Sequence, residues 1–125
     1  MKTKLIISIV LFLCLTGMKH KKEADYQREF CTDGIMEYPL KDMSRVDCLT
    51  EKYAIELDFA KGGKHYNCLG QALHYSAMTD KIGKCVLIVR KESEMKKVKA
   101  IRNAIKYHKL NIELDIIKDY EEIKW

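Results

Sequence analysis

The pattern of apolar and polar positions predicts an alternation of helices and strands after residue 22. Period-two alternation indicates strands, whereas apolar residues that recur every three to four positions indicate helices. Pro39 confines the first strand to a sheet edge or a strand end. The predicted elements are a helix over 23–30, strands over 34–40, 45–50 and 53–60, a helix over 64–78, a strand over 84–91, a helix over 93–108 and a strand over 111–118. The expected fold class is therefore α/β, with helices packed on a mixed sheet.

The first 22 residues have a different character. Lys2 and Lys4 precede an apolar run over residues 5–16, and further lysines follow that run. The run is shorter than the roughly 20 apolar residues that span a bilayer, which favours a cleaved signal peptide. An uncleaved membrane anchor, with residues 5–16 as the tether, is the alternative. Residues 23–125 are expected to form one domain that is exported (periplasmic or secreted) or anchored to the membrane.

The net charge of +5 comes from this N-terminal segment, which holds five lysines and no acidic residue. Residues 23–125 are formally neutral, so net charge gives no indication of nucleic-acid binding. A local basic run does exist, and a solvated helix face is its ordinary interpretation. It consists of Arg90, Lys91, Lys96, Lys97, Lys99, Arg102, Lys106 and Lys109.

Four cysteines lie outside the N-terminal segment: Cys31, Cys48, Cys68 and Cys85. In an oxidising compartment they allow three pairings, none of which can be read from the sequence. They lack the Cys-x-x-Cys spacing of a zinc site. Cys48, Cys68 and Cys85 sit within apolar patterns, which predicts ordinary buried thiols.

The predicted hairpin of the strands over 45–50 and 53–60 places two acids opposite one another. With positions that sum to 103 opposed, Asp47 faces Glu56. Like charges that face each other across a strand pair are destabilising, so something must compensate them. A hard divalent cation, a proton shared at raised pKa, and water at an exposed face are three such compensations. Geometry alone leaves a metal site and a solvated strand face both open.

The same register divides the hairpin into a polar face and an apolar face. The polar face consists of Arg45, Asp47, Glu56 and Asp58, and Arg45 opposes Asp58 within it. The apolar face consists of Val46, Cys48, Ile55, Leu57 and Phe59. Arg45 is therefore a candidate partner for the Asp58 carboxylate.

The helix over 64–78 carries two candidate stripes. The stripe expected to face the sheet, with Gly70 permitting close approach, consists of Leu69, Ala72, Leu73, Ser76 and Ala77. The stripe beside it consists of Lys64, Cys68, Gln71 and Tyr75. Lys64 and Gln71 are thus expected along one side of the helix.

Three segments in this order, RVDCLT, AIELDFA and GQALHYS, resemble a small bacterial family within the PD-(D/E)xK nuclease-like superfamily. The resemblance covers about residues 26–89. It implies the restriction-endonuclease-like fold, an α-β-β-β-α-β core with a mixed sheet, extended here by a further helix and strand. It also implies hydrolysis of phosphodiester bonds in DNA, with Mg²⁺ (or Mn²⁺) bound by Asp47 and Glu56. Glu29 would match the leading acid of the superfamily, and Gln71 would match its helix glutamine.

The chain departs from the superfamily pattern two residues after Glu56. A lysine is expected there to orient water and stabilise negative charge, and this chain has Asp58 instead. The role of that lysine would pass to Lys64, or less readily to Lys61. Asp58 would then be an additional metal ligand or the partner of Arg45.

These residues together predict a metal-dependent nuclease-like domain that acts on DNA. The expected catalytic residues are Asp47, Glu56, Lys64, Gln71 and Glu29, and the expected metal ligands are Asp47, Glu56 and Asp58. Two alternatives stay open. In one, the fold persists without turnover as an envelope module that binds nucleic acid or protein. In the other, the domain is structural and its acidic face is solvated.

Overall fold

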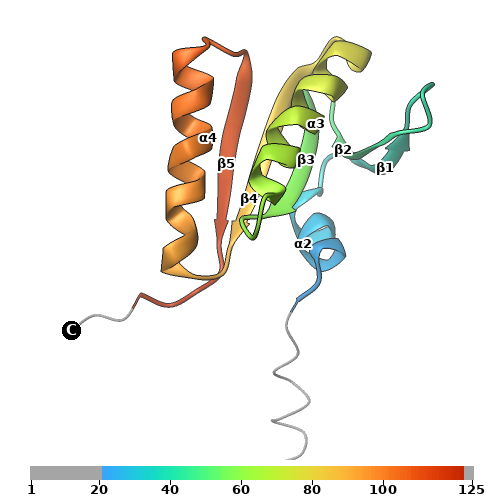
Figure 1. The fold of residues 1–125 in the computed structure, drawn as a ribbon. Helices are drawn as coiled ribbons and strands as arrows, with labels where there is room; N and C mark the ends of the chain where they lie inside the picture. Colours follow the sequence, from blue (N-terminus) through green and yellow to red (C-terminus); the bar gives the residue numbers. More distant parts are fainter. Residues whose placement is uncertain (1–20, 123–125) are drawn as a thin grey trace, which may run out of the picture.

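The computed structural model describes residues 21–122, so the predicted N-terminal signal or anchor lies, apart from its last two residues, outside the described part. The elements follow one another in the predicted order, and their bounds lie within a few residues of the predicted ranges. They are α2 (Glu23–Phe30), β1 (Ile35–Pro39), β2 (Arg45–Leu49), β3 (Tyr53–Phe59), α3 (Lys64–Thr79), β4 (Ile82–Val89), the short 3₁₀ helix η1 (Glu92–Glu94), α4 (Met95–Tyr107) and β5 (Ile112–Lys118), as drawn in Figure 1. The predicted α/β class and the order α-β-β-β-α-β-α-β are therefore confirmed.

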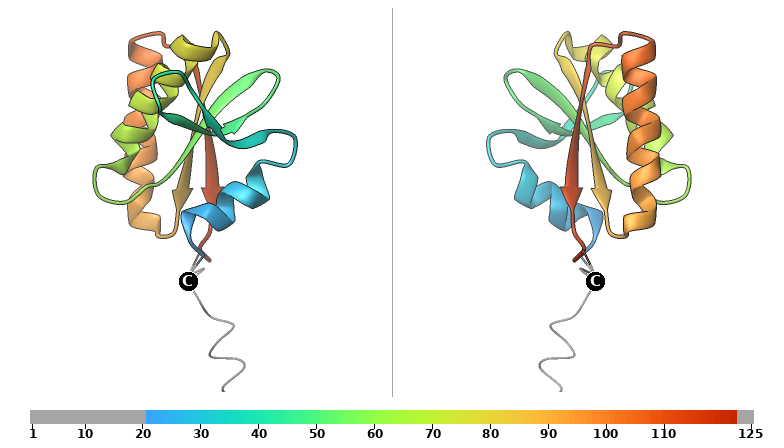
Figure 2. Two further views of the ribbon diagram at one scale, coloured as in Figure 1. Left: turned by 90° about the vertical axis from the view of Figure 1, so that its right-hand side faces the viewer. Right: turned by 90° about the vertical axis from the view of Figure 1, so that its left-hand side faces the viewer.

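The strands form one mixed sheet in the order β1-β2-β3-β4-β5. Short connections join β1, β2 and β3, which pair antiparallel, whereas α3 and α4 connect β3, β4 and β5, which pair parallel. The two views in Figure 2 show α3 and α4 on one face of the sheet and α2 on the other. β1 is an edge strand, as Pro39 predicts, and all its residues are exposed. The carboxyl ends of β3, β4 and β5 meet at the end of the sheet where α2 lies (Figure 1).

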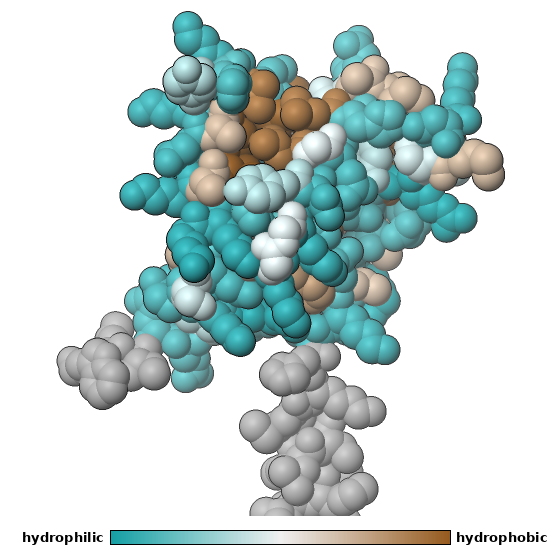
Figure 3. Space-filling model, in the orientation of Figure 1, coloured by the Kyte–Doolittle hydropathy of each residue, from teal (hydrophilic) through white to brown (hydrophobic). Residues whose placement is uncertain are grey.

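Apolar side chains fill both faces of the sheet. Beneath α3 and α4 the buried cluster consists of Ala60, Cys68, Ala72, Cys85, Leu87, Val89, Val98, Ile101 and Ile112. On the face of α2 it consists of Tyr26, Cys31, Cys48, Ile55, Leu57, Val86 and Ile88. Figure 3 shows that some apolar surface stays visible between α3 and α4, while most of the surrounding surface is hydrophilic.

α3 turns a different stripe to the sheet from the predicted one. Its buried residues are His65, Cys68, Ala72 and Tyr75, whereas Leu73 is 39% exposed. Close approach depends on Gly83 of β4 and not on Gly70, because a Cβ at position 83 would lie 2.4 Å from the carbonyl oxygen of Ala72. The physical reason for the rotation is covalent: Cys68 is bonded to a cysteine of β4.

The prediction of free buried thiols is wrong, because the four cysteines form two disulfides, Cys31–Cys48 and Cys68–Cys85. An apolar surrounding is common to thiols and disulfides, so the local pattern could not separate them. Gly34 leaves room for the first bond, since a Cβ there would lie 2.7 Å from the Sγ atom of Cys48. Two disulfides in a domain of this size suggest an oxidising compartment, extracellular or periplasmic. Within residues 21–122, no helix combines the length and apolar character needed to cross a membrane.

Candidate active site

The turn between β2 and β3 brings Asp47 and Glu56 together. Cys48 pairs with Ile55, so opposed positions sum to 103, as predicted. At Asp47, the next residue toward the start of β2, a side chain takes the place of a backbone acceptor. The Asp47 carboxylate oxygen Oδ2 accepts a hydrogen bond from the backbone N–H of Leu57, at 2.8 Å. The Asp47 charge also acts on Glu56 and raises the pKa of that carboxyl group. Backbone pairing stops at Cys48, but the Asp47 carboxylate still lies near Glu56, as the predicted register requires.

The rest of β2 departs from a flat hairpin. Val46 packs with Ala54 and Tyr75 on the α3 side of the sheet, whereas Cys48 packs on the α2 side. The predicted common face for Val46 and Cys48 is therefore wrong. Strict alternation fails because backbone pairing with β3 ends at Cys48, so the remainder of β2 follows β1 instead.

Arg45 does not reach Asp58. It is an exposed residue at the start of β2, paired with Pro39 of β1. Among residues 21–122 it forms no ion pair with an acidic side chain. The predicted opposition of Arg45 and Asp58 is wrong, because β2 leaves β3 before that position.

Glu56 is 5% exposed, and Asp58 is 8% exposed. Burial raises the pKa of Glu56 to about 10, and the charges of Asp47, Asp58 and Glu23 act in the same direction. Burial also raises the pKa of Asp47, while the hydrogen bond from Leu57 opposes that rise. A proton on Glu56 therefore offsets the repulsion in the ion-free protein. The alternative of a solvated acidic face is excluded by this burial.

Lys64, an exposed residue at the start of α3, acts electrostatically on two further acids, Asp58 and Glu23, and forms no ion pair with either among the described residues. Burial raises the pKa of Asp58 to about 7, with contributions from the charges of Glu23 and Asp47, and the Lys64 ammonium opposes the rise. Burial and the Asp47 charge raise the pKa of Glu23, and Lys64 again opposes them. The ammonium nitrogen of Lys64 also lies 5.7 Å from the centre of the Phe59 ring. Lys64 thus lies within electrostatic range of the acidic group, by which we mean Glu23, Asp47, Glu56 and Asp58, from across the Gly-Gly break.

Gln71 reaches the acids through Tyr75, one turn further along α3. The Tyr75 hydroxyl donates a hydrogen bond to Oε1 of Gln71, at 3.0 Å. Burial raises the pKa of Tyr75, and the charges of Glu56 and Asp47 act in the same direction. Tyr75 had no predicted role, although its i, i+4 spacing from Gln71 was the available signal.

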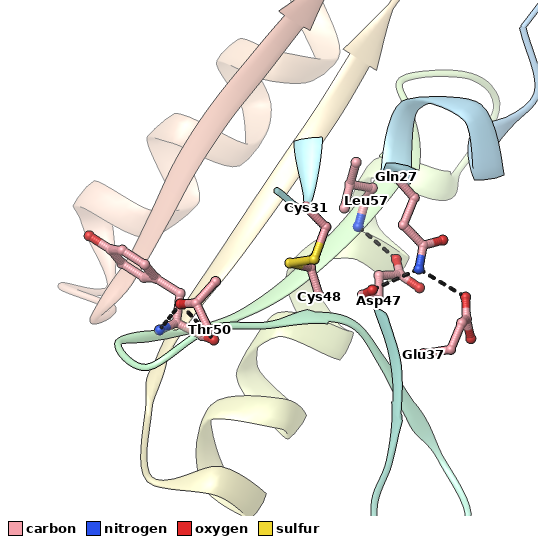
Figure 4. Close-up of a disulfide and its surroundings, with 8 residues drawn as sticks. Gln27, Cys31, Glu37, Asp47, Cys48, Thr50 and Leu57 are labelled. Carbon is pink, nitrogen blue, oxygen red and sulfur yellow. Dashed lines mark hydrogen bonds between the residues drawn. A yellow bond between two sulfur atoms is a disulfide. The ribbon is translucent and has the colours of Figure 1, made fainter. Parts of the chain in front are cut away.

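Gln27 of α2 is a second residue that the sequence did not reveal. Its side-chain amide donates to the backbone carbonyl oxygen of Asp47, at 2.7 Å, and to Oε1 of Glu37, at 3.0 Å (Figure 4). The residue is 5% exposed. Gln27 therefore holds α2 against the part of β2 that carries Asp47.

Glu29 lies away from the other predicted site residues. Its side chain is 61% exposed and pairs with Lys21, with 2.9 Å between nitrogen and oxygen. Glu23 is the acid of α2 that lies near Asp47 and Asp58. It precedes the buried residues Tyr26 and Gln27 by three and four positions, so it shares their face of the helix. Glu29 stands on another side of the helix. That helical spacing is the signal that could have identified Glu23.

The donor set suits a hard divalent cation. Oε2 of Glu56 and Oδ2 of Asp58 are buried and accept no hydrogen bond from the described residues. Within residues 21–122, no three side chains of Asp, Glu, His or Cys converge into a complete ion site. Mg²⁺ commonly takes only one or two carboxylates and keeps several waters, so the Asp47–Glu56 pair fits it.

The arrangement combines buried carboxylates able to hold a cation with a lysine at their border, which is chemistry suited to an anionic substrate. No protein-family model, no curated protein and no solved structure matches this chain.

Proposed function

We propose that residues 23–125 form a nuclease-like domain of the restriction-endonuclease-like class that hydrolyses phosphodiester bonds in DNA with Mg²⁺ or Mn²⁺. The observation that carries the proposal is the buried Glu56 carboxyl group within the field of Asp47, where a bound cation could replace the proton that otherwise offsets their repulsion. The confirmed element order agrees with the α-β-β-β-α-β core that the resemblance implies.

Asp47 and Glu56 would hold the cation, and the Asp58 carboxylate would add negative charge near it. When bound, the ion would supply positive charge against the phosphate and lower the pKa of a water for attack. Its binding requires Glu56 to lose a proton, so affinity rises with pH. The unpartnered oxygens of Glu56 and Asp58 support this assignment.

Other side chains of the domain would position the reactants. The Lys64 ammonium would stabilise the negative charge that develops on the phosphate, the role assigned elsewhere in the superfamily to the position of Asp58. Tyr75 and Gln71 would orient Glu56 from α3. Gln27 would fix the backbone of Asp47 from α2.

The compartment is part of the proposal. The disulfides suggest an oxidising environment. We infer that residues 1–22 direct export to the periplasm or the exterior by a cleaved signal, or tether the domain through an uncleaved apolar segment over 5–16.

Cleavage of supercoiled plasmid and of single-stranded DNA tests the proposal. The full chain, with its disulfides formed, is expected to cut in Mg²⁺ or Mn²⁺ and not in EDTA. Asp47→Asn and Glu56→Gln, which preserve shape, should each lower the rate by at least about 100-fold, since even residues that support ligands cost 10–100-fold. Glu51→Gln, at the exposed turn, is the matched control. Lys64→Gln should slow cleavage at saturating Mg²⁺, because the charge that stabilises the phosphate is lost.

A second function, binding without turnover, is favoured by one observation: Asp58 stands where the superfamily has its lysine. In that case DNA or a protein would be retained by the purified domain while no metal supports cleavage. Equal cleavage by the wild type, Asp47→Asn and Glu56→Gln would reject the nuclease proposal.

A further inference from the structure

A basic hollow lies at the carboxyl ends of β3 and β4, beside the acidic group. Its volume is about 490 Å³. Lys61 follows β3, and Arg90 and Lys91 follow β4. On the far side, α2 contributes Tyr26, and Lys21 precedes that helix. Helix and strand ends thus surround a space large enough for a phosphate group and part of its sugar.

The basic residues of the hollow outnumber its acidic residues. Lys61, Arg90 and Lys91 form no ion pair within residues 21–122. The two acids in the lining, Glu94 and Asp119, accept hydrogen bonds from the backbone N–H of Arg90, at 2.8 Å, and from the hydroxyl of Tyr26. Lys21, which also lines the hollow, is paired with Glu29. Glu94 and Asp119 keep their negative charges because both donors are neutral, so the basic residues outnumber them only modestly, and this net positive charge favours an anion.

The ring of Phe59 lies between the hollow and the acidic group. The guanidinium carbon of Arg90 lies 4.0 Å from the centre of the Phe59 ring, and the ammonium nitrogen of Lys64 lies 5.7 Å from the same point. Lys64 in turn acts on the charges of Asp58 and Glu23. Arg90, which lines the hollow, and Lys64, which acts on the acids, therefore lie around the same ring at the carboxyl end of β3.

We propose that this hollow binds a backbone phosphate of a DNA strand whose neighbouring phosphate lies at Asp47 and Glu56. The inference rests on the proposed function and names a strand-holding site for it. Arg90 offers the planar fork of donors that matches phosphate oxygens, and stacking on Phe59 restricts its orientation. Lys61 and Lys91 add charge that carries no base preference. The hollow would thus fix the strand without selecting a sequence.

Binding is measured in EDTA, so that no cleavage occurs, with the full chain and fluorescein-labelled single-stranded and duplex oligonucleotides. The double variant Lys61→Gln, Lys91→Gln and the single variant Arg90→Gln should each weaken binding about tenfold. On single-stranded DNA, the slope of log K against log salt should fall by about 0.7 for each phosphate that a variant no longer neutralises. Lys106→Gln, a matched removal of charge near the other end of α4, should bind like the wild type. Arg90→Lys should recover only part of the affinity.

The outcomes separate this inference from the proposed nuclease. Loss of DNA binding in the hollow variants, in a protein that never cleaves, would support the hollow and reject the nuclease. Binding by these variants equal to that of Lys106→Gln, or no DNA binding by the wild type, would overturn the hollow whatever the cleavage assay gives. Anionic phosphatidylglycerol vesicles form the second arm: a hollow-dependent loss of vesicle binding alone would overturn the DNA assignment. Lys61 and Lys91 are exposed, and an unchanged thermal midpoint verifies that the variants fold.

Discussion

At the scale of single residues, the protonation of Glu56 determines how the free energy of unfolding depends on pH. The pKa of Glu56 is raised from 4.5 to about 10, because the carboxylate would be buried beside Asp47. The folded protein therefore keeps a proton that the unfolded chain releases near its ordinary pKa. This contribution to stability is fully present below about pH 4.5 and is lost progressively as the pH rises toward 10.

Glu56→Gln is expected to reduce this dependence, because an amide does not titrate. In EDTA, the thermal midpoint of the wild type should fall between about pH 5 and about pH 9 by several degrees more than that of Glu56→Gln. Glu51→Gln, whose side chain is exposed, should follow the wild type. Parallel curves for the wild type and Glu56→Gln would show that the carboxyl group of Glu56 ionises normally. Added Mg²⁺ should raise the wild-type midpoint more at the higher pH, since ion binding displaces the proton.

At the scale of elements, the face that α2 presents decides which acid belongs to the site. Glu23 is half-buried and lies within the field of Asp47 and Lys64, whereas Glu29 is paired with Lys21 at the surface. Glu23→Gln should lower Mg²⁺-dependent cleavage by about 10–100-fold, the range for residues that support metal ligands. Glu29→Gln, a matched change on the same helix, should cut like the wild type. A larger loss of cleavage in Glu29→Gln than in Glu23→Gln would show that Glu29 is the leading acid, as the resemblance implies.

The elements themselves could be predicted because local pattern determines them. Period-two alternation identified β2 and β3, the 3.6-residue period identified α3 and α4, and Pro39 marked the edge strand. The register of β2 against β3 at Cys48 and Leu49 followed from the position of their turn, and extending it by one position brought Asp47 to the neighbourhood of Glu56.

Features that depend on distant contacts could not be predicted in this way. The rotation of α3 reflects the bond from Cys68 to β4 and the close approach at Gly83, neither of which the helix sequence contains. The bend of β2 arises where the Asp47 side chain takes the N–H of Leu57. Gln27 joins the site only because α2 crosses β2. The acidic pair was therefore accessible to sequence reasoning, and its supporting residues were not.

At the scale of the whole molecule, the two disulfides fasten the helices around the acidic pair. Cys31–Cys48 joins the end of α2 to the residue after Asp47. Cys68–Cys85 joins α3 to the residue of β4 that pairs with Glu56. Each bond therefore fixes a helix to a strand position directly beside one of the two acids.

Both bonds close loops of equal sequence separation, 17 residues. The chain-entropy relation gives about 3 kcal/mol of stabilisation for a loop of that length, so replacing either pair by alanines should lower the free energy of unfolding by about that amount, measured in urea. Cleavage under conditions where each variant stays folded should fall as well, because α2 and α3 carry the residues that position Asp47 and Glu56. Dithiothreitol should reproduce both effects in the wild type and cause neither in a variant without cysteines at all four positions. Full cleavage by the folded alanine variants would instead limit the disulfides to a stabilising role, with the acidic pair held by hydrogen bonds and packing alone.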